Sequence, residues 1–411
     1  MKDYELKNTP AIPCQGALSK ALENVGERAV ITLGLDIELA TPAGAIIIGG
    51  GNPIDLGKHP RTTWLALVKW LRERHATIHA AQEACGFGWQ FHRDLEAAGA
   101  TSLVVAPEDL NGQRKTDRRD ARQLASALWN YHQRGNTKAL RPVRIPLPEE
   151  QQRRAHCRQR SQCIETRHRL ETHGRSLLWD HDWLTVPEGW WKPRVWPRLE
   201  ADLKAAGKDW LIAMLTPHRQ IIVSLQERMT ALEKLINPAP PAPAAAAEQV
   251  PTSEAQATST TTIPTPDNSH NKTAEPAPSI LAKGLGGATQ TQIDAEVMDW
   301  QRFKNRGQAG SFIGCCPSER SSGKKQKLGS IDRIGNKRIR TMLVEAVWRL
   351  KKWNPGWRGF KKFAAVLGPG AKCGTGPRKK AVVACARLLM VDLWRLNTGR
   401  TTLKRIGLIP V

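Results

Sequence analysis

Hydrophobic residues in the first third of the chain alternate between strand-like and helix-like spacing. AVITLGLDIELATPAGAIIIGG, which starts at Ala29, predicts two β-strands joined by a turn at residues 41–44. Helical spacing follows in HPRTTWLALVKWLRERH, and the strand-like runs ATIHAAQEA and TSLVVAPEDL flank a second helical segment, GWQFHRDLEAAGA. A helix that begins near KTDRRDARQLA completes the series. This alternation predicts an α/β domain with a mixed sheet over residues 29–147.

The rest of the chain has three further compositions. Residues 148–236 hold two long amphipathic segments around a Trp- and Pro-rich connection, which predicts an antiparallel, coiled-coil-like helical arm that favours dimerisation. Residues 237–279 are rich in Pro, Ala, Ser and Thr with almost no large apolar residues, a composition typical of a disordered tether. Residues 280–411 regain the composition of a globular, mostly helical domain, and residues 1–28 are polar and are predicted to be an irregular tail.

The charge of the chain indicates what kind of partner it has. Lys and Arg number 62 against 38 Asp and Glu, which gives a formal net charge of +24 and predicts a nucleic-acid partner. A membrane partner is disfavoured, because no apolar stretch is long enough to span a bilayer and no basic segment has a clean apolar face. We find no apolar signal-peptide region, and the eight cysteines include no C-x-x-C pair. We therefore expect a cytoplasmic protein with reduced thiols and no zinc site.

Two aspartates three residues apart, Asp117 and Asp120, would share one face of the helix that begins in KTDRRDARQLA. They are either surface acids neutralised by neighbouring arginines or inward-facing ligands of a divalent cation. A two-metal site needs about four acidic ligands. Asp36 lies within the first strand, and Glu83 ends a later one. This layout of acids is that of the RNase H-like nuclease fold.

Several motifs, in this order, resemble the insertion-sequence one-ten family of bacterial transposases. GLDIELA, QEACGFGWQFHRDLEAAGATSLVVAP and KTDRRDA resemble its RuvC-like DEDD domain, and SERSSG followed by GNKRIR resembles its C-terminal serine domain. The resemblance covers about residues 29–236 and 280–370. It implies a RuvC-like (RNase H-like) domain, a helical coiled-coil arm and a mostly α C-terminal domain with a helix-hairpin-helix-like segment.

The resemblance also implies roles for particular residues. The acidic tetrad falls on Asp36, Glu83, Asp117 and Asp120, which would bind Mg²⁺, and the serine nucleophile falls on Ser322, with Ser321 as an alternative. The basic residues expected to contact nucleic acid are Lys115, Arg118, Arg119, Arg320, Lys324, Lys325, Lys327, Lys337, Arg338 and Arg340.

The function implied is a DNA transposase or recombinase that acts at the bacterial nucleoid through a covalent phosphoserine intermediate. A structured non-coding guide RNA and a homodimer or homotetramer with a composite active site are implied with it. One departure from the family is Glu38, which lies where a basic residue is common and could replace or supplement Asp36. Two other functions stay open: a metal-dependent junction-resolving nuclease without a covalent intermediate, and an inactive nucleic-acid-binding relative.

Overall fold

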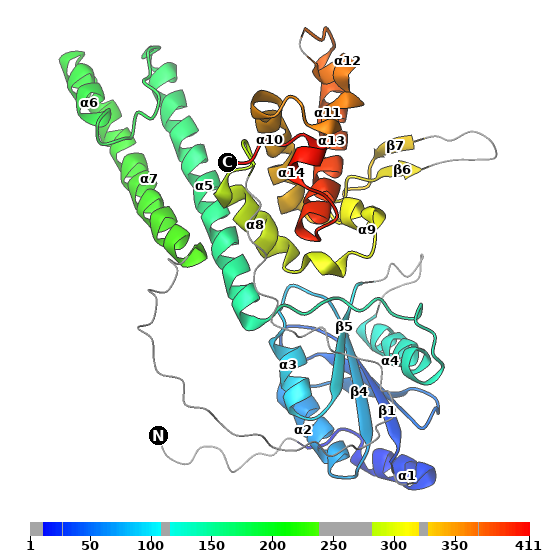
Figure 1. Cartoon of the computed structure of the whole chain (residues 1–411). Helices are drawn as coiled ribbons and strands as arrows, with labels where there is room; N and C mark the ends of the chain where they lie inside the picture. Colours follow the sequence, from blue (N-terminus) through cyan, green and yellow to red (C-terminus); the bar gives the residue numbers. More distant parts are fainter. Residues whose placement is uncertain (1–10, 27, 108–115, 238–281, 320–327, 369) are drawn as a thin grey trace, which may run out of the picture. The chain divides into compact units, whose positions relative to one another are not determined.

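The computed structural model describes residues 11–26, 28–107, 116–237, 282–319, 328–368 and 370–411. The chain forms two compact units, Met1–Ile145 and Pro146–Val411 (Figure 1). Both strands and helices are present, and the predicted α/β class with a mixed sheet is confirmed. The RuvC-like and helix-hairpin-helix-like assignments stay predictions, as do the finer domain boundaries.

The first unit is built on a five-stranded sheet in the order β3-β2-β1-β4-β5. The central strand β1 pairs in antiparallel fashion with β2 and in parallel with β4, while β3 extends the sheet beyond β2 and β5 lies parallel to β4. The strands are β1 (Val30–Asp36), β2 (Ala43–Ile48), β3 (Ile54–Lys58), β4 (Thr77–Glu83) and β5 (Thr101–Val105). The predicted hairpin at the start of the sheet is therefore present, whereas β3 was not expected from the sequence.

Helices cover both faces of this sheet, so β1 is buried on both sides. Figure 1 shows α2 (Arg61–Arg72) and α3 (Gln90–Ala97) on one side and α4 (Asp117–Gln133) on the other. Alternate residues of β1 serve the two faces, because successive side chains of a strand point in opposite directions. Leu33 and its odd-numbered neighbours join the core with α2 and α3, and Gly34 lies against α4.

The predicted tail at residues 1–28 contains a helix, which corrects the expectation of irregular chain. Helix α1 (Gln15–Val25) carries the fully buried Leu18, a member of the core formed by β1, α2 and α3. Most of its other positions are polar or exposed, so the apolar signal in the sequence was too weak to predict a helix.

The second unit contains the predicted antiparallel arm. Its long helices α5 (Pro148–Asp180) and α7 (Asp209–Ile236) pack along each other, and α6 (Trp196–Ala205) lies in the connection between them. Arg160, in the first half of α5, pairs with Glu233 near the end of α7, whereas His173, near the end of α5, lies against His218 in the first half of α7. The two helices therefore run in opposite directions. Whether the arm dimerises stays a prediction.

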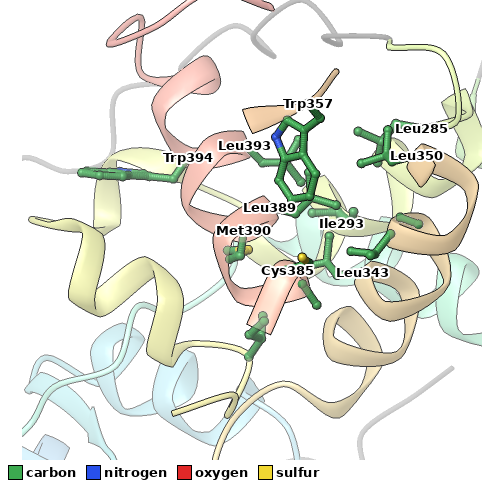
Figure 2. Packing of buried hydrophobic residues seen from close by; sticks show 14 of the residues in the cluster. Leu285, Ile293, Leu343, Leu350, Trp357, Cys385, Leu389, Met390, Leu393 and Trp394 are labelled. Carbon is green, nitrogen blue, oxygen red and sulfur yellow. The ribbon is translucent and has the colours of Figure 1, made fainter. Parts of the chain in front are cut away.

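The C-terminal part of the second unit is mostly helical, as predicted, around one hydrophobic core. Figure 2 shows Trp357 beside Leu389 and Leu393 of α13 (Thr375–Asn397), with Leu343 and Leu350 of α10 (Lys337–Trp353) in the same core. The elements are α8 (Gly287–Val297), the 3-10 helix η1 (Trp300–Arg302), α9 (Arg306–Ser311), β6 (Pro317–Glu319), β7 (Leu328–Ile331), α10 (Lys337–Trp353), α11 (Arg358–Lys361), α12 (Ala364–Leu367), α13 (Thr375–Asn397) and α14 (Leu403–Ile406).

The arm is joined to this core by a buried ionic contact. Glu296 of α8 is 4% exposed and receives hydrogen bonds from Arg158 of α5 at 2.7 and 2.8 Å. Asn336, which caps the start of α10, donates to the same carboxylate at 2.9 Å. One carboxylate therefore connects α5, α8 and the start of α10.

The packing of α4 on β1 predicts that Gly34→Ala destabilises the first unit. A Cβ at this position would lie 2.2 Å from the backbone O of Ala121 and 2.4 Å from the backbone N of Ala125. Because backbone atoms cannot rotate away, α4 must shift, and we expect a loss of about 1–3 kcal/mol in unfolding free energy, measured by urea denaturation.

Gly86→Ala is the matched control, since an added Cβ there meets no atom within 4 Å. It should leave the unfolding free energy unchanged within about 0.5 kcal/mol. Equal stability of Gly34→Ala and the wild type would show that α4 does not pack this closely on β1.

Candidate acidic site and nucleic-acid surfaces

The backbone of the first unit brings the ends of two parallel strands together. Asp36 is the last residue of β1, and Glu83 is the last residue of β4. The two strands pair in parallel with Leu35 opposite Gln82, so the next residues along each strand are Asp36 and Glu83. Two of the predicted acids therefore end adjacent strands at the same edge of the sheet.

Helix α4 brings the other two predicted acids to the same place. It begins at Asp117, so that Asp117 and Asp120 both lie in its first turn. The helix can lie close to β1 because Gly34 has no side chain, and because Ala121 and Ala125 are small and fully buried. The hydroxyl of Thr32 donates to the backbone O of Ala125 at 3.1 Å, which ties the helix to the strand.

The electrostatics of Asp36 show that these acids lie near one another. The pKa of Asp36 is raised from 3.8 to about 6, first by burial and then by the negative charges of Asp117, Asp120, Glu83 and Glu38. The structure therefore brings together all four predicted acids, with Glu38 as a fifth. One oxygen of Asp120, Oδ1, is buried and accepts no hydrogen bond within the described residues.

A lysine that the sequence analysis missed also belongs to this site. Lys58, the last residue of β3, forms an ion pair with Oδ2 of Asp117 and donates to Oε1 of Glu38 at 2.8 Å. These hydrogen bonds raise the pKa of Lys58, and the bond from Lys58 lowers the pKa of Asp117. In the sequence, only the short alternation of Ile54 and Leu56 could have indicated the strand that carries Lys58.

Two arginines in the first turns of α4, Arg118 and Arg122, lie against an acid of the sheet, whereas in a simple surface helix they would neutralise Asp120 of their own helix. Arg122 pairs with Asp55 of β3 at 2.7 Å, and Arg118 lies 3.9 Å from the same carboxylate. Both guanidinium groups are more than half exposed. Asp55 thus holds two guanidinium groups at the sheet, close to the acids at the start of α4.

The acid cluster has the donor chemistry of a site for a hard cation, since carboxylate oxygens are preferred ligands of Mg²⁺. The buried, unpaired oxygen of Asp120 fits such a use. In the parts of the chain that the structure describes, however, no group of three or more His, Cys, Asp or Glu side chains is placed to hold a metal ion. Metal binding by these acids therefore stays a prediction.

The predicted nucleophile and several predicted basic residues cannot be placed. Ser322 and its alternative Ser321 lie outside the described residues, in the segment between β6 and β7. The other predicted residues outside the description are Lys115, Arg320, Lys324, Lys325 and Lys327. Arg119, of α4, is described and exposed.

Three predicted basic residues near the start of α10 have different environments. Lys337 and Arg338 are exposed and line a hollow of about 400 Å³ between α5, α8 and α10. Arg340 instead donates to the backbone O of Ile313 at 2.8 Å, so it holds the turn before β6 in place. The hollow, with Lys337 and Arg338 at its edge, is a candidate surface for nucleic acid.

Two further expectations concern the cysteines and membranes. All eight cysteines are free, which agrees with the predicted reduced thiols. Among the described residues, no helix is both long enough and apolar enough to cross a bilayer.

The raised pKa of Asp36 predicts that Asp36→Asn stabilises the protein at neutral pH in the presence of a chelator. An acid whose pKa is raised from 3.8 to about 6 by folding makes the folded state less stable as pH rises through that range. The variant lacks this loss, so it should gain about 1–3 kcal/mol above pH 6 and nothing near pH 4.

Urea denaturation between pH 4 and pH 8 measures this difference. A variant that is less stable than the wild type at pH 7.5 would show that the carboxylate of Asp36 makes contacts that outweigh its repulsion by the other acids.

Comparison with known proteins identifies relatives along most of the chain. The transposase IS116/IS110/IS902 family matches residues 281–362. A putative transposase, y4rJ, of Sinorhizobium fredii is 27% identical over 328 residues, 77% of this chain and 76% of that protein. A probable family 20 transposase of Pseudomonas aeruginosa is 24% identical and covers 64% of this chain and 68% of its own length. The transposase for insertion sequence element IS1111A of Coxiella burnetii is 24% identical, with 64% and 63% covered. The family match over residues 281–362 and the relatives, all of them named transposases, together support the assignment of this chain as a transposase of the IS116/IS110/IS902 family.

Proposed function

We propose that this transposase cuts and rejoins DNA strands with a Mg²⁺-binding acidic tetrad, formed by Asp36, Glu83, Asp117 and Asp120, and with Ser322 as its nucleophile. The observation that carries the proposal is the environment of Asp36, whose pKa is raised to about 6 by burial and by the charges of the other three acids and Glu38. Several carboxylates close to a partly buried one destabilise the folded state, and perturbed pKa values of this kind cluster at functional sites.

The sheet supports an RNase H-like domain as the scaffold of this site. The order β3-β2-β1-β4-β5, with three antiparallel strands continued by two parallel ones, places Asp36 on the central strand and Glu83 beside it. Mg²⁺ bound there would neutralise charge on the scissile phosphate and orient the attacking group. The protein's own part is to hold four carboxylates within reach of one another.

The proposed covalent step conserves the phosphodiester bond. The hydroxyl oxygen of Ser322 attacks the scissile phosphorus and loses its proton, and the oxygen of the departing strand takes up a proton as its bond to phosphorus breaks. The hydroxyl of a new strand end then attacks the phosphoserine ester, and the serine oxygen is released with a proton. No ATP is needed, because each step exchanges one phosphate ester for another.

The partners of the reaction follow from the family resemblance. We infer that the protein binds donor and target DNA at the bacterial nucleoid in the cytoplasm, guided by a structured non-coding RNA. A homodimer or homotetramer would bring the acids of one subunit to Ser322 of another. The net charge of +24 is compatible with binding both nucleic acids but does not distinguish them.

A metal-dependent, junction-resolving nuclease is the second candidate function. The acid cluster lies wholly within the unit Met1–Ile145 and needs no residue from the unit that contains Ser322. Such an enzyme would use water as the nucleophile and form no covalent protein–DNA species.

The deciding experiment incubates the full-length protein with Mg²⁺, its element-end RNA and end-labelled DNA that carries the element junction. Denaturing electrophoresis then compares wild type, Ser322→Ala, Ser321→Ala and Asp120→Asn. We expect a DNA band retarded by covalent protein in wild type and Ser321→Ala, and its loss in Ser322→Ala and Asp120→Asn.

Each other outcome selects a different function. Cleavage that persists in Ser322→Ala without a covalent band would support the nuclease. The covalent band lost in Ser321→Ala but kept in Ser322→Ala would assign the nucleophile to Ser321. Absence of cleavage in wild type, with the RNA shown to be bound, would support the inactive nucleic-acid-binding relative.

The contact between Lys58 and Asp117 predicts that Lys58→Ala lowers the Mg²⁺ concentration needed to stabilise the protein. Lys58 holds Asp117 and Glu38 by charged hydrogen bonds, so a metal must compete with its ammonium group for these oxygens. We expect the midpoint of a thermal-shift titration with Mg²⁺ to fall severalfold in the variant.

Lys69→Ala is the matched control, because it removes the same charge from an exposed position on α2. It should leave the midpoint unchanged. A higher midpoint in Lys58→Ala would mean that Lys58 helps to hold the metal-binding conformation and does not compete with the ion.

A further inference from the structure

Two neighbouring hollows on the C-terminal part of the second unit are lined by arginines. The first, of about 430 Å³, lies between α9, α11 and α13, and the second, of about 310 Å³, lies between α11, the end of α13 and α14. Arg358 and Arg395 line both hollows, so the two hollows form one continuous surface. The arginine surface consists of Arg306, Arg358, Arg387, Arg395, Arg400 and Arg405.

This surface has almost no negative charge to balance it. The one acidic residue among those that line the hollows is Asp392, which is 1% exposed. Its carboxylate is already used by Arg358 and by the indole N–H of Trp357, at 2.9 Å from Oδ2. Within the described part of the chain, the other five arginines have no carboxylate partner.

The arginines are held in position by the helical core beneath them. Arg387 and Arg395 are eight residues apart on α13, so they lie on one face about 12 Å apart along the axis. The guanidinium of Arg400 stacks on the ring of Trp394 at 4.4 Å. Figure 2 shows Trp394 projecting from α13 away from Leu285 and Leu350. The Nε of Arg387 is buried and has no hydrogen-bond acceptor among the described residues.

We propose that the arginine surface binds the phosphate backbone of double-stranded DNA. Guanidinium groups bind phosphate oxygens in pairs of parallel hydrogen bonds, and the five arginines without a carboxylate partner exceed what one small anion can use. The choice of DNA rests on the proposed function as a DNA transposase. Arg387, Arg395, Arg400 and Arg405 lie beyond residues 281–362, the segment that matches the family.

Such a surface would position DNA without reading its sequence. Contacts to phosphates fix the register and orientation of a duplex, and sequence information comes from the bases. The arginine surface would therefore be a second region of contact with the DNA backbone, in addition to the candidate nucleic-acid surface at Lys337 and Arg338.

The test measures how duplex DNA binding by the full-length protein depends on salt, without Mg²⁺ so that no strand is cut. Fluorescence anisotropy compares wild type with the variant Arg395→Gln, Arg400→Gln, Arg405→Gln, whose side chains keep part of their length. With three phosphate contacts removed, we expect the slope of log K against log salt to become shallower by about 2.7 and affinity at 0.1 M salt to fall at least about tenfold.

A second triple variant controls for the loss of charge alone. Arg169→Gln, Arg194→Gln, Arg198→Gln removes three exposed arginines from the arm and its connection. An unchanged slope in the first variant, or an equal change in both variants, would overturn the proposal. If duplex DNA binding is unchanged and binding to duplex RNA of the same sequence is lost, the partner is RNA and the proposal for DNA fails.

A measurement on the unaltered protein guards against misfolding of the variants. Arginines are modified with phenylglyoxal in the presence and absence of duplex DNA and identified by mass spectrometry. We expect DNA to protect Arg395, Arg400 and Arg405 but not Arg198, and lack of protection would overturn the proposal. A wild type that binds no DNA would contradict the proposed function as well, whereas binding with unprotected arginines contradicts only this surface.

Discussion

The close contact between β1 and α4 determines where the cluster of four predicted acids forms. The backbone of Ala121 and Ala125 lies so close to Gly34 that no side chain would fit between the strand and the helix. The hydroxyl of Thr32 donates a hydrogen bond to the same turn of the helix. Asp36 follows Gly34 on the same face of the strand, and the first turn of α4 precedes Ala121 directly. The steric constraint on a glycine therefore places Asp117 and Asp120 beside Asp36 and Glu83.

This arrangement sets stability against function. Ionised Asp36 is disfavoured by burial and repelled by the other acids, so the folded state becomes less stable relative to the unfolded state as pH rises from 3.8 to about 6. Lys58 offsets part of the repulsion by binding Asp117 and Glu38. In a metal-binding site, the same lysine would be both a source of stability before the ion arrives and a competitor when it does.

Sequence patterns predicted those features that depend on neighbours along the chain. Periodicity predicted the paired strands β1 and β2 and the helices α2 to α5 and α7. The grouping of the four acids was predicted from their places on these elements together with the family resemblance. Strand β3 and helix α1 were missed, because each has few buried apolar residues. Lys58 and the arginine surface were missed for another reason: their partners are distant in sequence, as with Arg358 and Asp392, and no local pattern records such pairs.

The carboxylate of Glu296 has consequences for assembly beyond its own contacts. It is buried, and it is shared by Arg158 of the arm and by Asn336 at the start of α10. Only the carboxylate is fully buried, since Arg158 is 39% exposed, but removing Arg158 would leave Glu296 desolvated with Asn336 as its remaining side-chain donor. The arm and the C-terminal domain are therefore held together by a contact that is expensive to break. If the protein dimerises through its arm, each C-terminal domain must follow the helix that carries Arg158, so the geometry of the dimer would also set the spacing of the two serine-bearing domains.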